Sequence, residues 1–405
     1  MAAIIAPMAW NAAGSPLAEL STTSEVSGLG LRSVLTDPVA DVWRLAPEAA
    51  VPVGLPTDTA AGASAGASTT RQGSVSGPPG TSGGTAYSNA SGSAYVRPGS
   101  YAVLGGYLYE ITVWLRRAGG SAGKVGSAII AEYLNGSGAV QRSRLLMADV
   151  PVDDLWRQVT LRFVPPRDGP ATVYVAADTG PLQFELGPAS MVRIARQTRL
   201  DVDMGQDMAC RLLLLAAPRD GVLPVAGSTW RALGYDAAGL LVHDSGELAL
   251  APAPRGRWPY VLPAEVVVRR WRLVLRFGEG QPYAQFGRLY IGPAMVTSRA
   301  YGYGLQRGAS DLGSSQRSAG SGVRYPTRAV TLQQRSWRLP SLSAADAAAL
   351  DDIGLLVGTT GQVFAAPSIA EPERDGLLGT FSTPPAPKQD NFVFWSADMA
   401  LQEDR

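Results

Sequence analysis

The chain has 405 residues, enough for about two or three domains, and 46% of them are apolar, which suffices for packed cores. Thirty-five basic residues against thirty-four acidic ones leave a net charge of +1, so no overall field draws the chain to nucleic acid or to an anionic membrane. The 46 glycines and 30 prolines favour turns and short strands over long helices, and we predict an all-β, multi-domain fold with one or two helices.

Residues 1–55 carry short apolar runs between turn residues, a pattern that predicts strands. The first residues lack the basic segment of a secretory signal, and no later stretch approaches the ~20 apolar residues of a membrane helix. Residues 56–100 are rich in Gly, Ser, Ala and Thr, which predicts a linker or a long surface loop. We therefore expect no membrane insertion and a chain that folds in a cytoplasm.

Two strand-rich blocks follow. In residues 101–195 a period-two pattern, clearest from Tyr107 to Leu115, predicts a compact β-sandwich. Residues 196–297 repeat the pattern and include the single cysteine, Cys210, in an apolar run typical of a core. One thiol closes no intrachain disulfide and excludes a cysteine-rich metal site. Both blocks end on similar Gly-Pro segments, which favours two similar units in series.

Residues 298–405 change character. The Gly/Ser-rich stretch 301–323 predicts an exposed arm, which we expect to become ordered only on assembly. Ser343, followed three residues later by Asp346, is typical of a helix N-cap, so we predict a helix near 343–356 that ends at Gly358. Alternating segments on both sides of the helix predict strands at 329–339, 362–366, 377–381 and 391–399. The block is interpreted as a β-rich C-terminal unit with one helix.

Several short segments form a recognisable set: Ser21–Glu25, Thr36–Pro38, Trp43–Arg44, Leu200–Gly205, Leu212–Leu215, His243–Gly246, Arg270–Arg272 and Gly287–Pro293. Together they resemble the discoidin-like jelly-roll domains of tailed-bacteriophage minor tail, or distal-tail-like, proteins. The resemblance implies one split β-sandwich made of residues 1–55 and 196–297, with 101–195 inserted into it. The insert, through its runs 109–115 and 155–163, resembles carbohydrate-binding modules.

This resemblance implies a structural component of a phage tail tip or baseplate. Residues 298–405 would dock on the tail tube or hub, while the sandwiches project outward. It further implies a homo-oligomeric ring of three or six copies in the virion tail, assembled in the host cytoplasm. The candidate residues for this assembly interface are Tyr301, Tyr303, Arg324, Tyr325 and Trp395.

The sequence offers little catalytic equipment. Its one histidine, His243, lies beside Asp244 in a predicted turn, which favours a solvated residue over a member of a Ser-His-Asp triad. A glycoside hydrolase needs two carboxylates across a cleft, and the candidates are Asp153 with Asp154, Asp201 with Asp203, Glu247, and Asp351 with Asp352. Paired acids in turns and helix starts are more typical of solvated or capping groups. We expect a protein that is not an enzyme and has no cofactor or metal, although Asp201 and Asp203 are candidate calcium ligands.

Binding of a host surface glycan is the alternative function. Sugars stack on aromatic rings and accept hydrogen bonds from guanidinium groups, so the candidate contacts are Tyr107, Tyr109, Trp230, Trp258 and Arg257. Trp114 and Trp156 are further possible platforms, but their place in strands favours packing inside a core. Two rival functions stay open, a receptor-binding adhesin and a glycan-degrading depolymerase. A basic cluster or phosphate-binding loop that would indicate a nucleic-acid partner is missing from the sequence.

Overall fold

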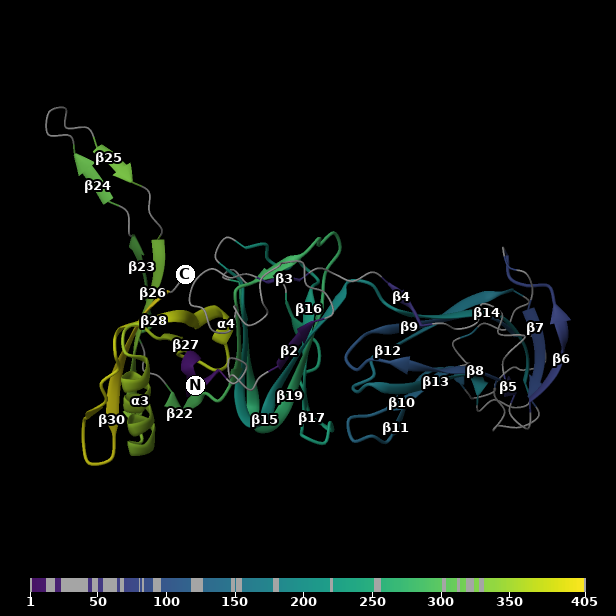
Figure 1. Ribbon diagram of the computed structural model, residues 1–405, viewed down its shortest axis with the longest axis horizontal. Helices are drawn as coiled ribbons and strands as arrows, with labels where there is room; N and C mark the ends of the chain where they lie inside the picture. Colours follow the sequence, from purple (N-terminus) through teal and green to yellow (C-terminus); the bar gives the residue numbers. More distant parts are fainter. Residues whose placement is uncertain are drawn as a thin grey trace.

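The computed structural model describes residues 2–11, 19–22, 43–45, 50–53, 64–65, 69–79, 81, 84–89, 96–117, 127–146, 150, 155–177, 182–218, 221–250, 256–300, 304–311, 314–317, 324–327 and 331–403. Antiparallel strands dominate this part of the chain, so the predicted all-β, multi-domain fold is confirmed. The strands form a C-terminal, a central and an inserted unit, which lie in a row in that order (Figure 1).

The strands of the central unit are β2 (Glu19–Thr22), β3 (Trp43–Leu45), β15 (Gln197–Ala216), β16 (Thr229–Tyr235), β17 (Leu241–Asp244), β18 (Leu248–Ala249), β19 (Arg257–Arg276), β20 (Ala284–Phe286) and β21 (Arg288–Gly292). The larger sheet has the order β17-β16-β19-β15-β2, with β18 beside β16 and β21 beside β15. The two long strands β15 and β19 pair along their length and bend where Gly205 adopts a φ of +75°. Because β2 pairs with β15 and β3 with β20, this unit is split in the sequence.

The inserted unit contains β4 (Val51–Pro52), β5 (Ser64–Ala65), β6 (Thr69–Val75), β7 (Gly84–Asn89), β8 (Val96–Val103), β9 (Tyr109–Arg117), β10 (Ser127–Leu134), β11 (Val140–Leu146), β12 (Arg157–Phe163), β13 (Gly169–Ala177) and β14 (Leu182–Arg193). One sheet has the order β11-β10-β13-β8-β5 and the other β12-β9-β14-β7-β6, with β4 beside β14. Alternate residues of β9 point into the core between the two sheets: Tyr109, Ile111, Val113 and Leu115. The predicted strand is confirmed, and the packing of the two sheets buries the face of Tyr109 rather than that of Trp114.

The prediction that residues 56–100 form a linker or loop is wrong for the part that the structure describes. Strands β5 to β8 fall in this range and pair within both sheets of the inserted unit. Residues 56–100 as a whole are rich in Gly, Ser, Ala and Thr and poor in large apolar residues, a composition typical of loops. Tyr87 and Val96 supply the buried apolar groups of this segment.

The C-terminal unit contains β1 (Ala2–Pro7), the 3-10 turn η1 (Met8–Trp10), β22 (Met295–Ala300), β23 (Gln306–Asp311), β24 (Ser314–Arg317), β25 (Arg324–Thr327), β26 (Thr331–Leu342), α3 (Ala344–Val357), β27 (Gln362–Ala366), α4 (Pro372–Asp375), β28 (Leu377–Thr383), β29 (Lys388–Gln389) and β30 (Trp395–Glu403). Its main sheet has the order β22-β1-β27-β28-β30-β26-β23, with β29 beside β30. Strand β1 thus lies inside this sheet. The prediction that placed all of residues 1–55 in the split sandwich is wrong for β1 and for β4, which pairs with β14 of the inserted unit.

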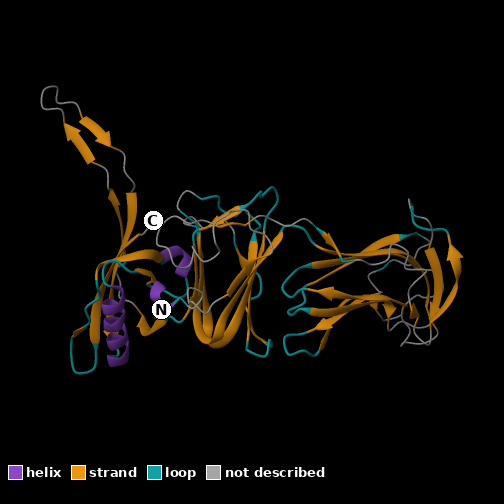
Figure 2. Ribbon diagram, viewed as in Figure 1, coloured by secondary structure: helices purple, strands orange, loops and turns teal. Residues whose placement is uncertain are grey.

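The predicted helix is confirmed as α3. The Ser343 hydroxyl accepts a hydrogen bond from the Asp346 N–H (3.0 Å), and Gly358 follows the last turn at a φ of +58°. Among the described residues the helices all belong to the C-terminal unit (Figure 2). None of these helices is long and apolar enough to cross a membrane. Strand β24, within the predicted arm 301–323, and β25, just after it, form a hairpin that projects from the unit beyond β23 and β26 (Figure 1).

The main sheet of the C-terminal unit is covered on both faces. Ala3 and Ile5 of β1 pack in one cluster with Leu350 of α3. Ile4 and Ala6 pack on the other side in a cluster with β15 and β21 of the central unit. Burial on both faces explains why β1 is a continuous apolar run rather than an alternating one.

The central and inserted units meet around Arg272 of β19, whose side chain is 2% exposed. Its guanidinium donates to the Asp168 carboxylate through Nη1 (2.5 Å) and Nη2 (3.0 Å), and to Asp201 through Nε (2.8 Å). The Tyr235 hydroxyl donates to the Pro166 carbonyl nearby (2.8 Å). Charge-assisted, bidentate contacts of this kind fix the relative orientation of two surfaces.

Candidate functional site

The predicted glycan contacts lie inside the protein. Tyr107 and Tyr109 belong to the core of the inserted unit, and Trp230 and Trp258 to that of the central unit, each at most 2% exposed. Arg257 is also buried and forms an ion pair with Glu403 across the interface to the C-terminal unit. A ring must expose a face to stack on a sugar, so these five residues form no glycan platform in this structure. The period-two pattern located these strands but did not show which face of each strand is exposed to solvent.

The predicted calcium ligands are engaged by arginines instead. Asp201 lies 2.8 Å from both Arg199 and Arg272, and Asp203 lies 3.2 Å from Arg269. These ion pairs already neutralise the two carboxylates. Within the described residues, no group of three or more acidic, histidine or cysteine side chains is arranged to hold a metal ion. The geometry therefore contradicts the calcium prediction for this pair.

The assembly residues are only partly placed. Tyr301 and Tyr303 lie outside the described residues, while Arg324 and Tyr325 belong to β25 in the projecting hairpin. Trp395 begins β30 and packs, half-buried, against the core beneath α3. Its role at an interface remains a prediction, but most of its surface is already used within the chain.

The candidate catalytic groups do not converge. His243 lies in β17 rather than in a turn, and its Nε2 is 3.0 Å from the Tyr260 hydroxyl. Burial lowers the pKa of this histidine. Asp351 and Asp352 are exposed on α3, and Glu247 pairs with Arg276 at 3.1 Å, whereas Asp153 and Asp154 lie outside the described residues.

The surface that best fits glycan chemistry is one that the sequence assigned to a core. Trp114 lies on the outer face of β9, opposite its buried neighbours, and is half-buried, as is Trp156 just before β12. Gln158 is the cross-strand partner of Trp114. The Arg116 guanidinium lies 5.0 Å from the centre of the Trp156 ring and forms an ion pair with Glu185. We call this set the tryptophan face.

Contacts with Ser76 and Gly84 fix the position of the Trp156 ring in the tryptophan face. The Trp156 Nε1 donates to the Ser76 carbonyl (3.2 Å), which ties the ring to the loop after β6. A Cβ at Gly84 would lie 2.8 Å from the same ring, so only glycine allows this close approach. Aromatic rings, a guanidinium and an amide on one fixed surface are suited to stacking on a sugar and donating to its hydroxyls.

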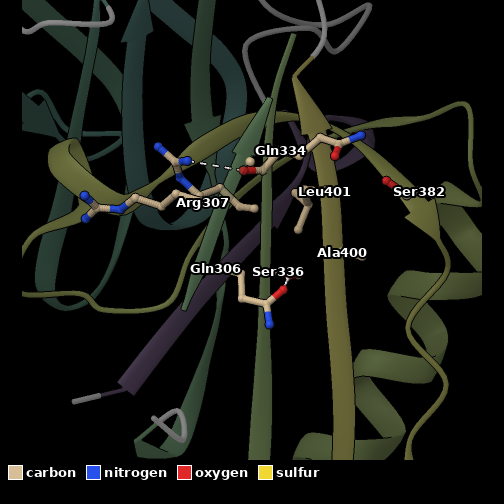
Figure 3. A pocket seen from close by; sticks show the side chains of 9 residues that line it. Gln306, Arg307, Gln334, Ser336, Ser382, Ala400 and Leu401 are labelled. Atoms are coloured by element: carbon tan, nitrogen blue, oxygen red, sulfur yellow. Dashed lines mark hydrogen bonds between the residues drawn. The ribbon is translucent and has the colours of Figure 1, made fainter. Parts of the chain in front are cut away.

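A second candidate is a polar hollow of 390 Å³ on the C-terminal unit. Figure 3 shows that side chains from β23, β26, β28 and β30 line it, with Gln306 beside Ser336 and with Arg307 and Gln334 pointing away from each other. The lining residues are Gln306, Arg307, Gly308, Gln334, Arg335, Ser336, Ser382, Ala400 and Leu401. Arg307 is partly neutralised by an ion pair with Asp375. The hollow offers hydrogen-bond donors to a polar ligand, but no aromatic ring lines it.

Comparison with known proteins gives likeness of fold only. No family model and no curated protein matches the chain. The CBM22-1 xylan-binding domain from Paenibacillus barcinonensis Xyn10C is 12% identical, over 36% of this chain and 97% of that one, with a TM-score of 0.29. The tandem CBM22-1-CBM22-2 domain of the same protein is 9% identical, over 62% and 99%, with a TM-score of 0.29. The CBM6cm-2 module from Cellvibrio mixtus lichenase 5A is 12% identical, over 35% and 95%, with a TM-score of 0.23. No functional argument rests on scores this low.

Proposed function

We propose that this chain is a non-enzymatic structural component of a tailed-bacteriophage tail tip or baseplate. The C-terminal unit docks on the tail tube or hub, and the central and inserted units project from it. Copies of the chain form a ring of three or six in the virion tail, which is assembled in the host cytoplasm. The identity of the tail partners comes from the sequence resemblance described above.

One observation carries this proposal: the three units lie in a row and are joined by buried contacts at both junctions (Figure 1). At the junction with the C-terminal unit, Arg257 pairs with Glu403, and Arg288 donates to Gln362 (3.0 Å) beside a shared apolar cluster. Such junctions hold the outer units at a fixed angle to the docking end. A scaffold needs this property, whereas units on loose linkers lack it.

The test is cryo-electron microscopy of particles from the source, combined with mass spectrometry of purified tails. We expect density for the chain at the tail tip, in a ring, with the C-terminal unit facing the axis. Absence of the chain from purified particles would exclude the virion role. Release of reducing ends from host polysaccharide by the pure protein would contradict the non-enzymatic part of the proposal.

Glycan binding is the second candidate function, and the tryptophan face is the observation that favours it. We expect saturable binding of host surface polysaccharide in a calorimetric titration. Replacing Trp114 with Ala should weaken this binding at least about tenfold, or roughly 1.4 kcal/mol. The matched control is Arg162→Ala, on an exposed pair with Glu110 in the same sheet. If the unaltered protein shows no saturable binding, or if both variants bind equally well, the glycan-binding function is excluded.

A further inference from the structure

An exposed apolar turn on the C-terminal unit is fixed in shape. Residues 390–394 join β29 to β30, and Phe392 at the tip is completely exposed, with Val393 beside it at 65%. The Asn391 side-chain oxygen accepts hydrogen bonds from the N–H groups of Val393 and Phe394, both at 2.9 Å. The Arg299 guanidinium lies 4.3 Å from the centre of the Phe394 ring and supports the turn from below. We call residues 390–394 the Phe392 knob.

A fully exposed phenylalanine on a turn of fixed shape is suited to anchor an interface. Because hydrogen bonds already hold the turn, little conformational entropy is lost when a partner buries the ring. Aromatic anchors of this kind dominate the binding energy of many protein interfaces. The knob is therefore suited to bind in an apolar hollow on another molecule.

The same chain has such a hollow. A groove of 540 Å³ lies between α4, with the segment before it, and β19 of the central unit. Its apolar lining consists of Pro259, Val261, Ile369, Ala370 and Pro372. Its rim carries the exposed carboxylates Glu371 and Glu373, together with Arg374. We call it the α4 groove, and its size is within the range of hollows that hold ligands or side chains.

The charges around the two features are complementary. Lys388 is exposed next to the knob, and Arg338 lies 3.7 Å from Asp390, so cations outnumber anions there. The groove rim carries two carboxylates against one guanidinium. In Figure 1, β30 lies on the side of the C-terminal unit away from the central unit, whereas α4 faces the central unit. The knob and the groove of one copy therefore lie too far apart to bind each other, whereas the knob of one copy can reach the groove of another copy.

We propose that copies of this chain associate head to tail, with the Phe392 knob of one copy seated in the α4 groove of the next. The contact joins two different surfaces, so repetition gives a closed ring or an open filament rather than a simple dimer. The inference rests on the proposed ring and adds the surfaces that form it. It does not depend on the partner in the phage tail.

Cysteine trapping tests the contact, because the native thiol, Cys210, is buried. The full chain carrying both Phe392→Cys and Ala370→Cys should form covalent multimers beyond the dimer under mild oxidation. The matched control pairs Ala370→Cys with Val140→Cys, a residue 64% exposed on β11 of the inserted unit, and it should give no such ladder. Absence of the ladder, or an equal ladder from the control, would overturn the knob-and-groove contact.

The mass of the protein in solution separates this inference from the proposed ring itself. By light scattering we expect a multimer for the native chain, a monomer for Phe392→Asp and a multimer for the control Val140→Asp. A circular dichroism spectrum of Phe392→Asp that matches the native spectrum will show that the fold is intact. If Phe392→Asp keeps the native mass, a ring exists but the knob does not form it. If the native chain is a monomer, both the ring and the contact fail.

Discussion

Removing the Arg272 side chain should destabilise the junction between the central and inserted units more than any exposed ion pair could. In Arg272→Leu, the Asp168 and Asp201 carboxylates lose the guanidinium that they share. Loss of one partner of a buried ion pair costs about 3–5 kcal/mol. Asp201 keeps Arg199 at 2.8 Å, and Asp168, 45% exposed, can be hydrated. We therefore expect a loss at the lower end, about 3 kcal/mol.

Urea unfolding followed by tryptophan fluorescence measures this loss. With a slope of roughly 1–3 kcal/mol per M, the midpoint should fall by about 1–3 M. The control is Arg162→Leu, the same change on a pair whose arginine is 65% exposed, and it should cost below about 1 kcal/mol. Equal midpoints for Arg272→Leu and Arg162→Leu would refute the idea that burial gives this junction its strength.

Three further predictions concern other parts of the fold. Burial alone would raise the pKa of Asp168, but the hydrogen bond and charge of Arg272 hold that pKa below its ordinary value. The native chain should therefore be more stable than Asp168→Asn above about pH 4. This advantage should disappear as the pH falls through the pKa of Asp168 in the folded state, which acid titration of unfolding will show. Gly106 has a φ of +86°, and a Cβ there would lie 2.6 Å from Val274, so Gly106→Ala should cost about 1–3 kcal/mol in the same urea assay, and a neutral effect would contradict the close packing at this junction. Burial raises the pKa of Cys210 to about 11, so its thiol should stay unreactive toward a disulfide reagent at pH 8 until urea unfolds the chain; fast reaction in the native state would show that the core opens.

Local patterns predicted the elements well. The alternation from Tyr109 to Leu115 marked a strand, and Ser343 with Asp346 marked the start of α3 to within a residue. Both signals depend only on neighbours in the sequence. Long-range pairing leaves no such signal: nothing in the apolar run of β1 shows that its partners are β22 and β27.

The candidate sites were harder to predict, because a sequence does not say which apolar residues face water. Trp114 looked like a core residue since β9 carries apolar groups on both faces, and only the packing of the two sheets decides which face is covered. Phe392 was assigned to a strand over 391–399, but Asn391 turns the chain there. Tyr107 and Trp258 are of residue types that often stack on sugars, but both side chains are buried in a core.

The position of β1 in the sheet means that this strand cannot pair until much later parts of the chain have been synthesised. The Ala3 N–H bonds to the Thr297 hydroxyl, 294 residues further along the chain. At the usual pace of translation, β1 waits roughly 15–60 s on the ribosome for that partner. During this time an apolar strand with both edges open is exposed to other nascent chains and to chaperones. A chain that ends before β27 leaves one edge of β1 unpaired, so only chains translated past that strand complete the sheet around β1.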